Sequence, residues 1–157
     1  MAGDSRWSEI ETIYRLRLST FVRVARAVTG ERESALEAVQ EGFADALRHV
    51  EGWDGRGVLE AWVWRCVVNR ARKAVRPRPS LLPVGVIDDF EWLRNDDLRE
   101  RIAELPERQR LVVFLRYFAD LDYRAIADVL GIGVGTVSAT LHSAHVALRA
   151  ALQEVSA

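Results

Sequence analysis

The chain has 157 residues, of which 49% are hydrophobic and 29% are charged, and its formal net charge is -1. This composition is typical of a folded soluble protein, and it excludes both a disordered chain and a protein that wraps nucleic acid through net positive charge. The apolar stretches are far shorter than the roughly 20 residues that cross a bilayer, and the single cysteine, Cys66, cannot form an intramolecular disulfide. We therefore expect a cytoplasmic protein that does not insert into a membrane.

Helical periodicity runs through the first half of the chain. Apolar residues recur at spacings of three and four from about Ser8 to Val28 and again over Arg32–Val50, which predicts two helices that each bury one face. A third helix is predicted over about 59–76, where a proline ends it because the residue before a proline avoids helical geometry. Between the second and third helices, three glycines in Glu51–Gly57 predict a loop that carries a tryptophan.

The pattern changes at residues 77–97, which hold three of the four prolines followed by a cluster of acidic residues. This composition predicts an extended linker between domains at residues 8–76 and 98–155. The predicted helices of the second domain are Leu98–Leu105, Glu107–Ala119, Tyr123–Leu130 and Gly135–Val155. The predicted fold class is therefore all-α, with two small helical domains joined by a linker.

The segment Tyr123–Leu141 has the spacing of a helix-turn-helix. Such a motif needs a small residue in its first helix, a glycine with left-handed backbone at the turn, and an apolar residue in its second helix. Ala127, Gly131 and Val137 supply these at spacings of four and six. An ordinary helical hairpin that turns on a glycine is the alternative that the spacing leaves open.

Both halves of the chain resemble one family. LPERQRLVVFLRYFADLDYRAIADVLGIGVGTVSATLHSAHVALR, at Leu105–Arg149, resembles region four of sigma-70 family RNA polymerase sigma factors, particularly the small extracytoplasmic-function (ECF) type. EAVQEGFADAL at Glu37–Leu47 is similar to region 2.2, and AWVWRCVVNRARKAVR at Ala61–Arg76 is similar to regions 2.3 and 2.4. The resemblance covers about Ile10–Leu152 in the family's order. It implies a transcription initiation factor that binds core RNA polymerase, recognises promoter elements about ten and thirty-five base pairs upstream of the start, and assists strand opening.

Other function classes find less support in the sequence. No Gly-rich phosphate loop, metal-spaced set of Cys and His, or nucleophile with a positioned base is visible, so we expect neither an enzyme nor a cofactor or metal. A stand-alone helix-turn-helix regulator would leave the tryptophan-rich first domain unexplained. A protein-interaction adaptor on a sigma-like scaffold, without initiation activity, stays open. An anti-sigma factor that holds the protein inactive is a further partner that the resemblance allows.

Strand opening requires side chains that replace the stacking lost by an extruded base, at roughly 1–3 kcal/mol per base. Trp53 lies on the loop where the resembled family forms its pocket for an extruded base of the upstream-ten element. Trp62 is expected in the core, whereas for Trp64 a core role and a DNA-facing role are equally compatible with the sequence. Polar side chains of the same helix form an edge suited to phosphates and bases, although a solvated charged face is the alternative. This predicted DNA edge consists of Arg65, Asn69, Arg72, Lys73 and Arg76.

An acidic, hydrogen-bonding strip is predicted on the second helix, beside its apolar stripe, because its members recur at three- and four-residue steps. The strip consists of Glu37, Gln40, Glu41 and Asp45. In the resembled family this strip meets a basic coiled coil of the clamp in the largest polymerase subunit. An ordinary solvent-exposed helix face is the alternative.

The predicted recognition helix is poor in basic residues. Members of the resembled family commonly carry arginine at the positions of Ser138, Thr140, Ser143 and His145. The residues that we expect to contact DNA here are Arg124, Thr136, Ser138, Ala139, His142 and Ser143. Because most of these side chains are short and uncharged, we expect weak reading of the upstream-thirty-five element, with most promoter affinity coming from the first domain and from tethering to polymerase.

Overall fold

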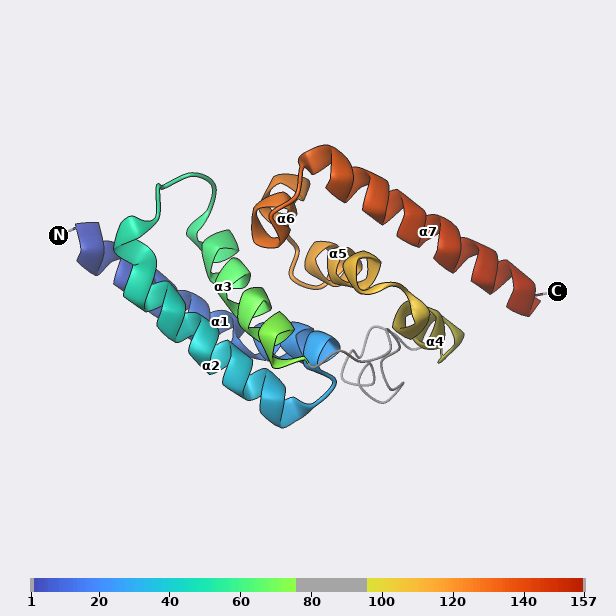
Figure 1. Cartoon of the computed structure of the whole chain (residues 1–157), viewed down its shortest axis with the longest axis horizontal. Helices are drawn as coiled ribbons and strands as arrows, with labels where there is room; N and C mark the ends of the chain where they lie inside the picture. The colour runs from blue at the N-terminus through green and yellow to red at the C-terminus, as the bar shows by residue number, and fades with distance from the viewer. Residues whose placement is uncertain (1, 76–95, 157) are drawn as a thin grey trace.

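The structure is a computed structural model, and it describes residues 2–75 and 96–156 of the chain. Within these two ranges every regular element is a helix (Figure 1). The helices are α1 (Ala2–Thr29), α2 (Arg32–His49), the short 3-10 helix η1 (Val50–Gly52), α3 (Leu59–Ala74), α4 (Asp96–Glu104), α5 (Glu107–Tyr117), α6 (Tyr123–Leu130) and α7 (Val134–Ser156). This confirms the predicted all-α fold class. The predicted linker at 77–97 lies almost wholly outside the described residues.

Helices α1, α2 and α3 form a three-helix bundle around an aromatic centre. Phe21 of α1 stacks on Trp64 of α3, with ring centroids 3.8 Å apart and planes inclined by 16°. Phe43 of α2 meets Phe21 edge-on at 4.9 Å, and Tyr14 meets Phe43 in the same way at 5.0 Å. These rings make contacts that are specific in geometry, and they join all three helices of the bundle.

Helix α1 begins at Ala2 rather than at the predicted Ser8. Asp4 lies in its first turn, where a negative charge favours the positive end of the helix. Arg6 donates to the carbonyl of Val50 at 3.2 Å, so the added turns are held against η1 by a bond that the local sequence does not reveal.

Helices α2 and α3 approach each other closely at Gly42. A Cβ at this position would lie 2.6 Å from the Cα of Val67, so only glycine fits without moving the backbone of one helix. One turn further along α2, Asp45 is bound by Arg70 of α3, with Nε–Oδ2 at 2.5 Å and Nη2–Oδ1 at 2.9 Å. Hydrogen bonds from Arg70 hold the pKa of Asp45 below its usual value.

The C-terminal half contains the predicted helix-turn-helix. Asp122 caps α6 by accepting a hydrogen bond from the backbone N–H of Ala125 at 2.8 Å. Gly131 ends the helix in left-handed conformation, with φ of 66°, and the chain bends by 101° between α6 and α7. No single helix among the described residues is long and apolar enough to span a membrane, and α6 and α7 pass that test only together, across this bend.

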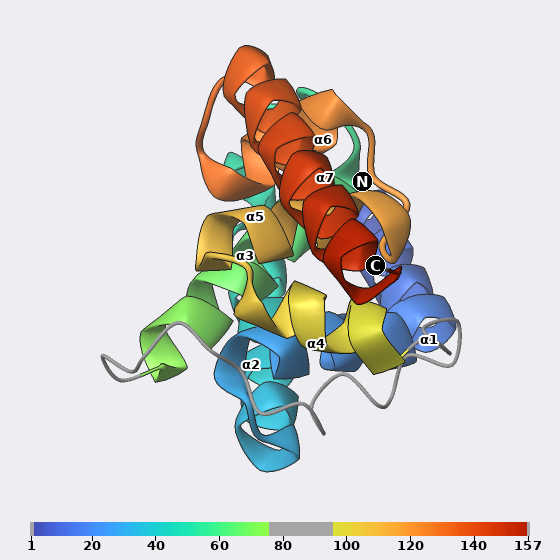
Figure 2. The ribbon, with the colours of Figure 1, turned by 90° about the vertical axis from the view of Figure 1, so that its right-hand side faces the viewer.

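The two halves pack against each other, which the sequence did not predict. Helix α6 lies against α3, and α5 lies against α1, as two perpendicular views show (Figures 1 and 2). Arg17 of α1 donates to the carbonyl of Ala119, which follows α5, at 2.7 Å. The guanidinium of Arg23 also lies 5.9 Å from the ring centre of Phe118. Residues more than 90 positions apart are therefore joined by polar and by cation–π contacts.

We predict that Gly42→Ala destabilises the fold by about 1–3 kcal/mol, because the added methyl group forces α2 and α3 apart. Urea unfolding followed by circular dichroism measures the change. Gly52→Ala is the matched control, since a Cβ at Gly52 meets nothing within 4 Å and its φ is not positive. Equal stability of the two variants would contradict the close approach at Gly42.

We also predict that Asp45→Asn lowers the urea midpoint at neutral pH, because the charge-assisted bonds from Arg70 are weakened. The folded-state pKa of Asp45 lies below its unfolded value of about 4, so this stabilisation is complete above that value. It is lost as the pH falls through the folded pKa, and the wild type and variant should then converge. Glu11→Gln is the control, because Glu11 belongs to an exposed pair with Arg15.

Candidate nucleic-acid interface

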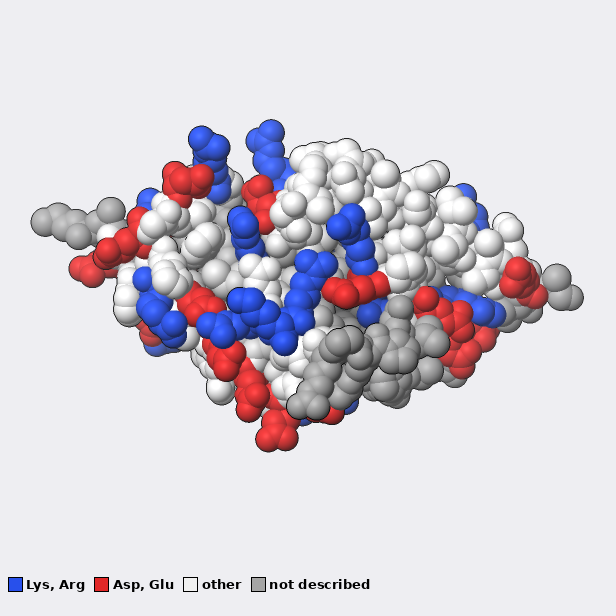
Figure 3. Space-filling view, viewed as in Figure 1, with Lys and Arg blue, Asp and Glu red and all other residues white. Residues whose placement is uncertain are grey.

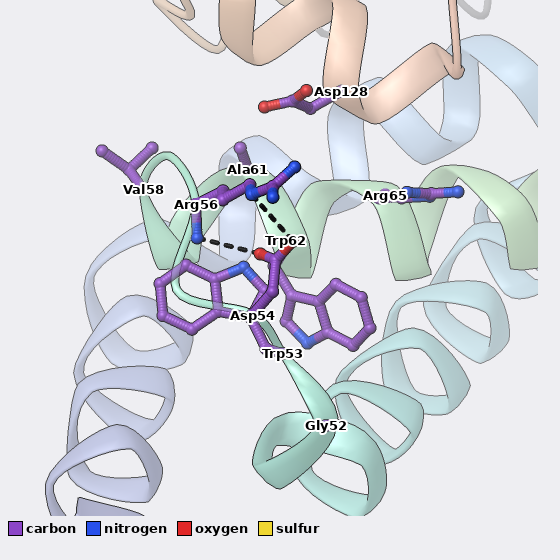
Figure 4. Close-up of a pocket in the computed structure, with 9 residues that line it drawn as sticks. All are labelled: Gly52, Trp53, Asp54, Arg56, Val58, Ala61, Trp62, Arg65 and Asp128. Carbon is purple, nitrogen blue, oxygen red and sulfur yellow. Dashed lines mark hydrogen bonds and ion pairs between the residues drawn. The ribbon is translucent and has the colours of Figure 1, made fainter.

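A pocket of about 320 Å³ lies where η1 and the following loop meet the start of α3 (Figure 4). Trp53, from the loop, and Trp62, from α3, line it with their indole rings. Arg56 and Arg65 add two guanidinium groups. The other lining residues are Gly52, Asp54, Val58, Ala61 and Asp128. Aromatic faces beside cations suit a base that stacks and a phosphate that needs neutralising.

The loop that carries Trp53 is shaped by its own backbone. Gly55 and Gly57 have φ of 79° and 72°, a region that residues with a Cβ rarely adopt. Asp54 accepts a hydrogen bond from the backbone N–H of Arg56 at 2.9 Å, and its carboxylate lies 3.6 Å from the Nε of the same residue (Figure 4). The loop is therefore a defined turn that presents the indole of Trp53 at the pocket.

Arg6 of α1 also contacts this loop, at Trp53. Its guanidinium lies 5.1 Å from the centre of the Trp53 ring and donates to the Trp53 carbonyl at 3.3 Å. Sequence reasoning missed Arg6 because a contact across 47 positions leaves no periodic signal. Arg6 is thus a residue that positions Trp53 without lining the pocket itself.

The structure assigns a core role to Trp64, and it places Trp62 both against the core and at the pocket. Trp64 is fully buried, stacks on Phe21 and donates its indole N–H to Glu60 at 3.4 Å, so the DNA-facing role allowed for Trp64 is wrong for this structure. Trp62, which was expected in the core, is half-buried and lines the pocket. The reason is the rotation of α3, because residues two apart on a helix point in directions about 200° apart.

The predicted DNA edge lies along α3, on the side away from the aromatic core. Three of its five members are exposed, namely Arg65, Asn69 and Lys73. A fourth, Arg72, is half-buried and pairs with Glu107 of α5, with Nε–Oε1 at 3.0 Å. The fifth, Arg76, lies outside the described residues. Figure 3 shows a row of basic side chains where α3 lies, continuing toward the C-terminal half.

The predicted acidic strip is only partly free. Glu37, Gln40 and Glu41 are exposed along α2, and Glu41 also pairs with Arg70, with Nη1–Oε2 at 3.4 Å. Asp45 differs, because Arg70 binds both of its carboxylate oxygens and leaves its side chain 19% exposed. Assigning Asp45 to a contact surface is therefore corrected: its carboxylate links α2 to α3 within the bundle.

An apolar groove of about 640 Å³ runs between α1 and α2 beside this strip. Trp7, Tyr14, Phe43 and Leu47 line it, and Gln40 of the strip stands at its edge. Trp7 is 51% exposed, which is unusual for so large an apolar ring. The sequence reading missed the groove because it began the first helix after Trp7.

Helices α6 and α7 expose the side chains that we expected to contact DNA in the C-terminal half. All six residues expected to contact DNA are exposed: Arg124, Thr136, Ser138, Ala139, His142 and Ser143. His145 is instead half-buried, and its Nε2 lies 2.8 Å from the hydroxyl of Tyr117 on α5. In Figure 3 the surface over the start of α7 is almost free of charged side chains.

Comparison with known proteins gives matches to both halves of the chain. Residues 13–78 match the family model described as "Sigma-70 region 2", and residues 95–153 match "Sigma-70, region 4". The chain is 30% identical over 134 residues to RNA polymerase sigma factor SigV of Bacillus subtilis (strain 168), covering 79% of each chain. It is also 30% identical over 156 residues to RNA polymerase sigma-E factor of Streptomyces avermitilis, covering 92% of this chain and 86% of that protein.

Two solved structures have the same fold. CnrH in complex with the cytosolic domain of CnrY matches with a TM-score of 0.73 and 20% identity, over 97% of this chain and 95% of that chain. RpoE of Bartonella quintana, in complex with the anti-sigma factor NepR, matches with a TM-score of 0.68 and 18% identity, over 92% and 97%. Since both regions match in family order and the identity to SigV spans most of each protein, this chain belongs to the sigma-70 family of RNA polymerase sigma factors, in the ECF type that contains regions 2 and 4.

Proposed function

We propose that this sigma factor binds core RNA polymerase, directs it to specific promoters and opens the duplex chiefly through region 2. The observation that carries the proposal is the pocket at Trp53 and Trp62, because it lies at the start of the same helix that carries the basic edge. The protein acts by binding alone, and the chemistry belongs to the polymerase. We place it in the cytoplasm with that enzyme.

Core polymerase would bind along α2. Glu37, Gln40 and Glu41 offer exposed polar groups that attract a basic partner and speed its encounter. The neighbouring groove, with Trp7 at its mouth, offers the apolar surface from which most binding energy usually comes. A basic coiled coil with a few apolar side chains fits both features.

Promoter opening would use the pocket and the edge together. An extruded base of the upstream-ten element stacks on Trp53 and Trp62, which offsets the stacking that it loses in the duplex. Arg65 is exposed beside the pocket, and Lys73 is exposed further along α3. Both can bind the phosphates of the same strand. Asn69 lies between them and can read a base edge.

Region 4 would read the upstream-thirty-five element weakly. Thr136 and Ser138 lie in the first turns of α7, where backbone N–H groups assist in binding phosphate. Arg124 is exposed at the start of α6 and supplies one charged contact. Short side chains with little charge orient region 4 on the DNA but contribute little affinity. Tethering to polymerase therefore has to supply most of the affinity for this element.

We also propose an anti-sigma factor as a partner. RpoE, which shares the fold, is seen in complex with the anti-sigma factor NepR, and CnrH is seen with a domain of another protein. The exposed groove between α1 and α2 and the edge on α3 are surfaces on which such a partner would compete with polymerase or DNA.

For region 2 we predict that Trp53→Ala lowers open-complex formation on duplex promoters by roughly ten-fold or more, because one stacking face is lost. A pre-melted promoter should restore much of the activity, since its base is already unpaired. Fluorescence of a base analogue at the upstream-ten element, with reconstituted holoenzyme, measures opening directly.

Trp7→Ala is the comparison variant, because it removes a tryptophan from the groove and not from the pocket. It should weaken association with core polymerase and reduce activity equally on duplex and pre-melted templates. If Trp53→Ala instead shows equal loss on both templates, or loses core binding, the pocket does not hold an extruded base.

For region 4 we predict that Ser138→Arg with Ser143→Arg tightens holoenzyme binding to duplex promoters. The plot of log K against log salt should steepen by about 0.9 for each added phosphate contact. Ala150→Arg with Gln153→Arg adds the same charge further along α7 and should leave the slope nearly unchanged. If scrambling the upstream-thirty-five element abolishes binding by the unmodified holoenzyme, region 4 is a strong reader and the proposal is wrong.

A further inference from the structure

Arg6, in the second turn of α1, contacts the pocket loop in three ways. Its Nη1 donates to the carbonyl of Val50 at 3.2 Å and to the carbonyl of Trp53 at 3.3 Å. Its guanidinium also lies over the indole of Trp53, 5.1 Å from the ring centre. One side chain of the N-terminal helix therefore binds both the backbone and the ring of the residue that we assign to base capture.

The two carbonyls that Arg6 binds belong to the first residue of η1, Val50, and to the residue that follows η1, Trp53. Val50 is fully buried in the core of the bundle, and it also accepts a hydrogen bond from the backbone N–H of Trp53 at 3.2 Å. Since Nη1 of an arginine carries two hydrogen atoms, it can bind both carbonyls at once. Arg6 thereby holds Trp53 at a fixed place relative to a buried residue.

The turn that follows Trp53 is shaped mainly from within. Residues 54–57 are exposed, and Asp54 binds the backbone and the side chain of Arg56 in the same turn. These contacts define the form of the turn, whereas its position on the three-helix bundle is set where it joins η1 and α3. At the η1 end, the joining residue is Trp53, which is the residue that Arg6 binds.

Arg6 covers a side of Trp53 that the pocket does not use. Trp53, Trp62 and Arg65 line the pocket, and Arg6 is not among its lining residues (Figure 4). The guanidinium therefore leaves the pocket side of the indole open to a base. An aromatic ring that is already fixed in one orientation loses less conformational freedom when it binds, so the contacts with Arg6 favour capture of the base.

We propose that Arg6 is a positioning residue for strand opening, which holds the indole of Trp53 in the orientation that receives the extruded base and does not itself touch DNA. The inference rests on the proposed role of Trp53 in base capture. Arg6 precedes the residues 13–78 that match the region 2 model, so that match assigns it no role. It is also half-buried, and both carbonyls compete with phosphate for its donors.

The test is Arg6→Met in the full-length chain, which keeps an unbranched side chain and removes the donors and the charge. Holoenzyme is reconstituted at a sigma concentration that saturates core polymerase, and a fluorescent base analogue at the upstream-ten element of a duplex promoter reports opening. We expect opening to slow by roughly three- to ten-fold, because the stacking face of Trp53 is no longer held in place.

Arg15→Met is the matched control, because Arg15 lies on the same helix in an exposed pair with Glu11. It should leave opening unchanged, and an equal loss in the control and in Arg6→Met would overturn the inference. Circular dichroism melts show whether each variant is folded. Arg6→Gln, which removes the charge and shortens the side chain, takes the place of Arg6→Met if the latter does not fold, with the same expected result.

Combining Arg6→Met with Trp53→Ala distinguishes positioning from a general structural role. If Arg6 acts through the indole, the double variant opens the promoter as slowly as Trp53→Ala alone, because the ring that Arg6 holds is already missing. If the two losses multiply instead, Arg6 acts independently of Trp53 and the positioning role is wrong.

A salt series shows whether Arg6 touches DNA. For binding of the holoenzyme to the duplex promoter, the slope of log K against log salt should be the same for Arg6→Met and for the wild type. A slope that is shallower by about 0.9 indicates one lost phosphate contact and overturns the inference.

Failure of the positioning role differs from failure of the pocket. If Trp53→Ala slows opening and the folded Arg6 variant does not, Arg6 does not position the indole, and the proposed pocket stands. If Trp53→Ala itself leaves opening intact, the pocket does not capture a base, and the role of Arg6 fails with it.

Discussion

Helix α3 packs closely against α2 at Gly42, where a Cβ would lie 2.6 Å from the Cα of Val67, so α3 is rotated with its Val67 face toward α2. That rotation turns Trp64 into the aromatic core and leaves Trp62, Arg65 and Lys73 on the opposite side. The pocket and the basic edge lie on the side of α3 that this rotation turns away from the aromatic core. The close approach at Gly42 is therefore one of the contacts that orient the side chains that we propose region 2 offers to DNA.

The sequence predicted the helices because their apolar periodicity is regular, and it predicted the turn before α7 because a left-handed residue there requires a glycine such as Gly131. It expected Trp62 in the core without its place at the pocket, and it left Trp64 open, since the start of α3 is apolar on nearly every side and carries no clear stripe. The bond from Arg70 to Asp45 and the position of Arg6 on Trp53 join distant residues, so no local pattern indicates them.

Regions 2 and 4 differ in where they carry exposed charge, and this difference suits different roles in binding polymerase and DNA. Region 2 carries the aromatic pocket with its cations and the exposed acids of α2, so it can bind both polymerase and DNA. Region 4 presents a recognition helix with little charge, yet two of its acids face region 2. The weak DNA binding that we propose for region 4 and its contact with α3 both favour a region 4 that acts mainly through its position.

The central claim is that promoter choice depends mainly on region 2. Transcription by core polymerase reconstituted with this sigma factor, from a library with randomised upstream-ten and upstream-thirty-five elements, tests it directly. Sequencing of the transcribed promoters should show strongly constrained bases in the upstream-ten element and weak preferences in the upstream-thirty-five element. A sharply constrained upstream-thirty-five element beside an unconstrained upstream-ten element, or no transcription at all, would contradict the account.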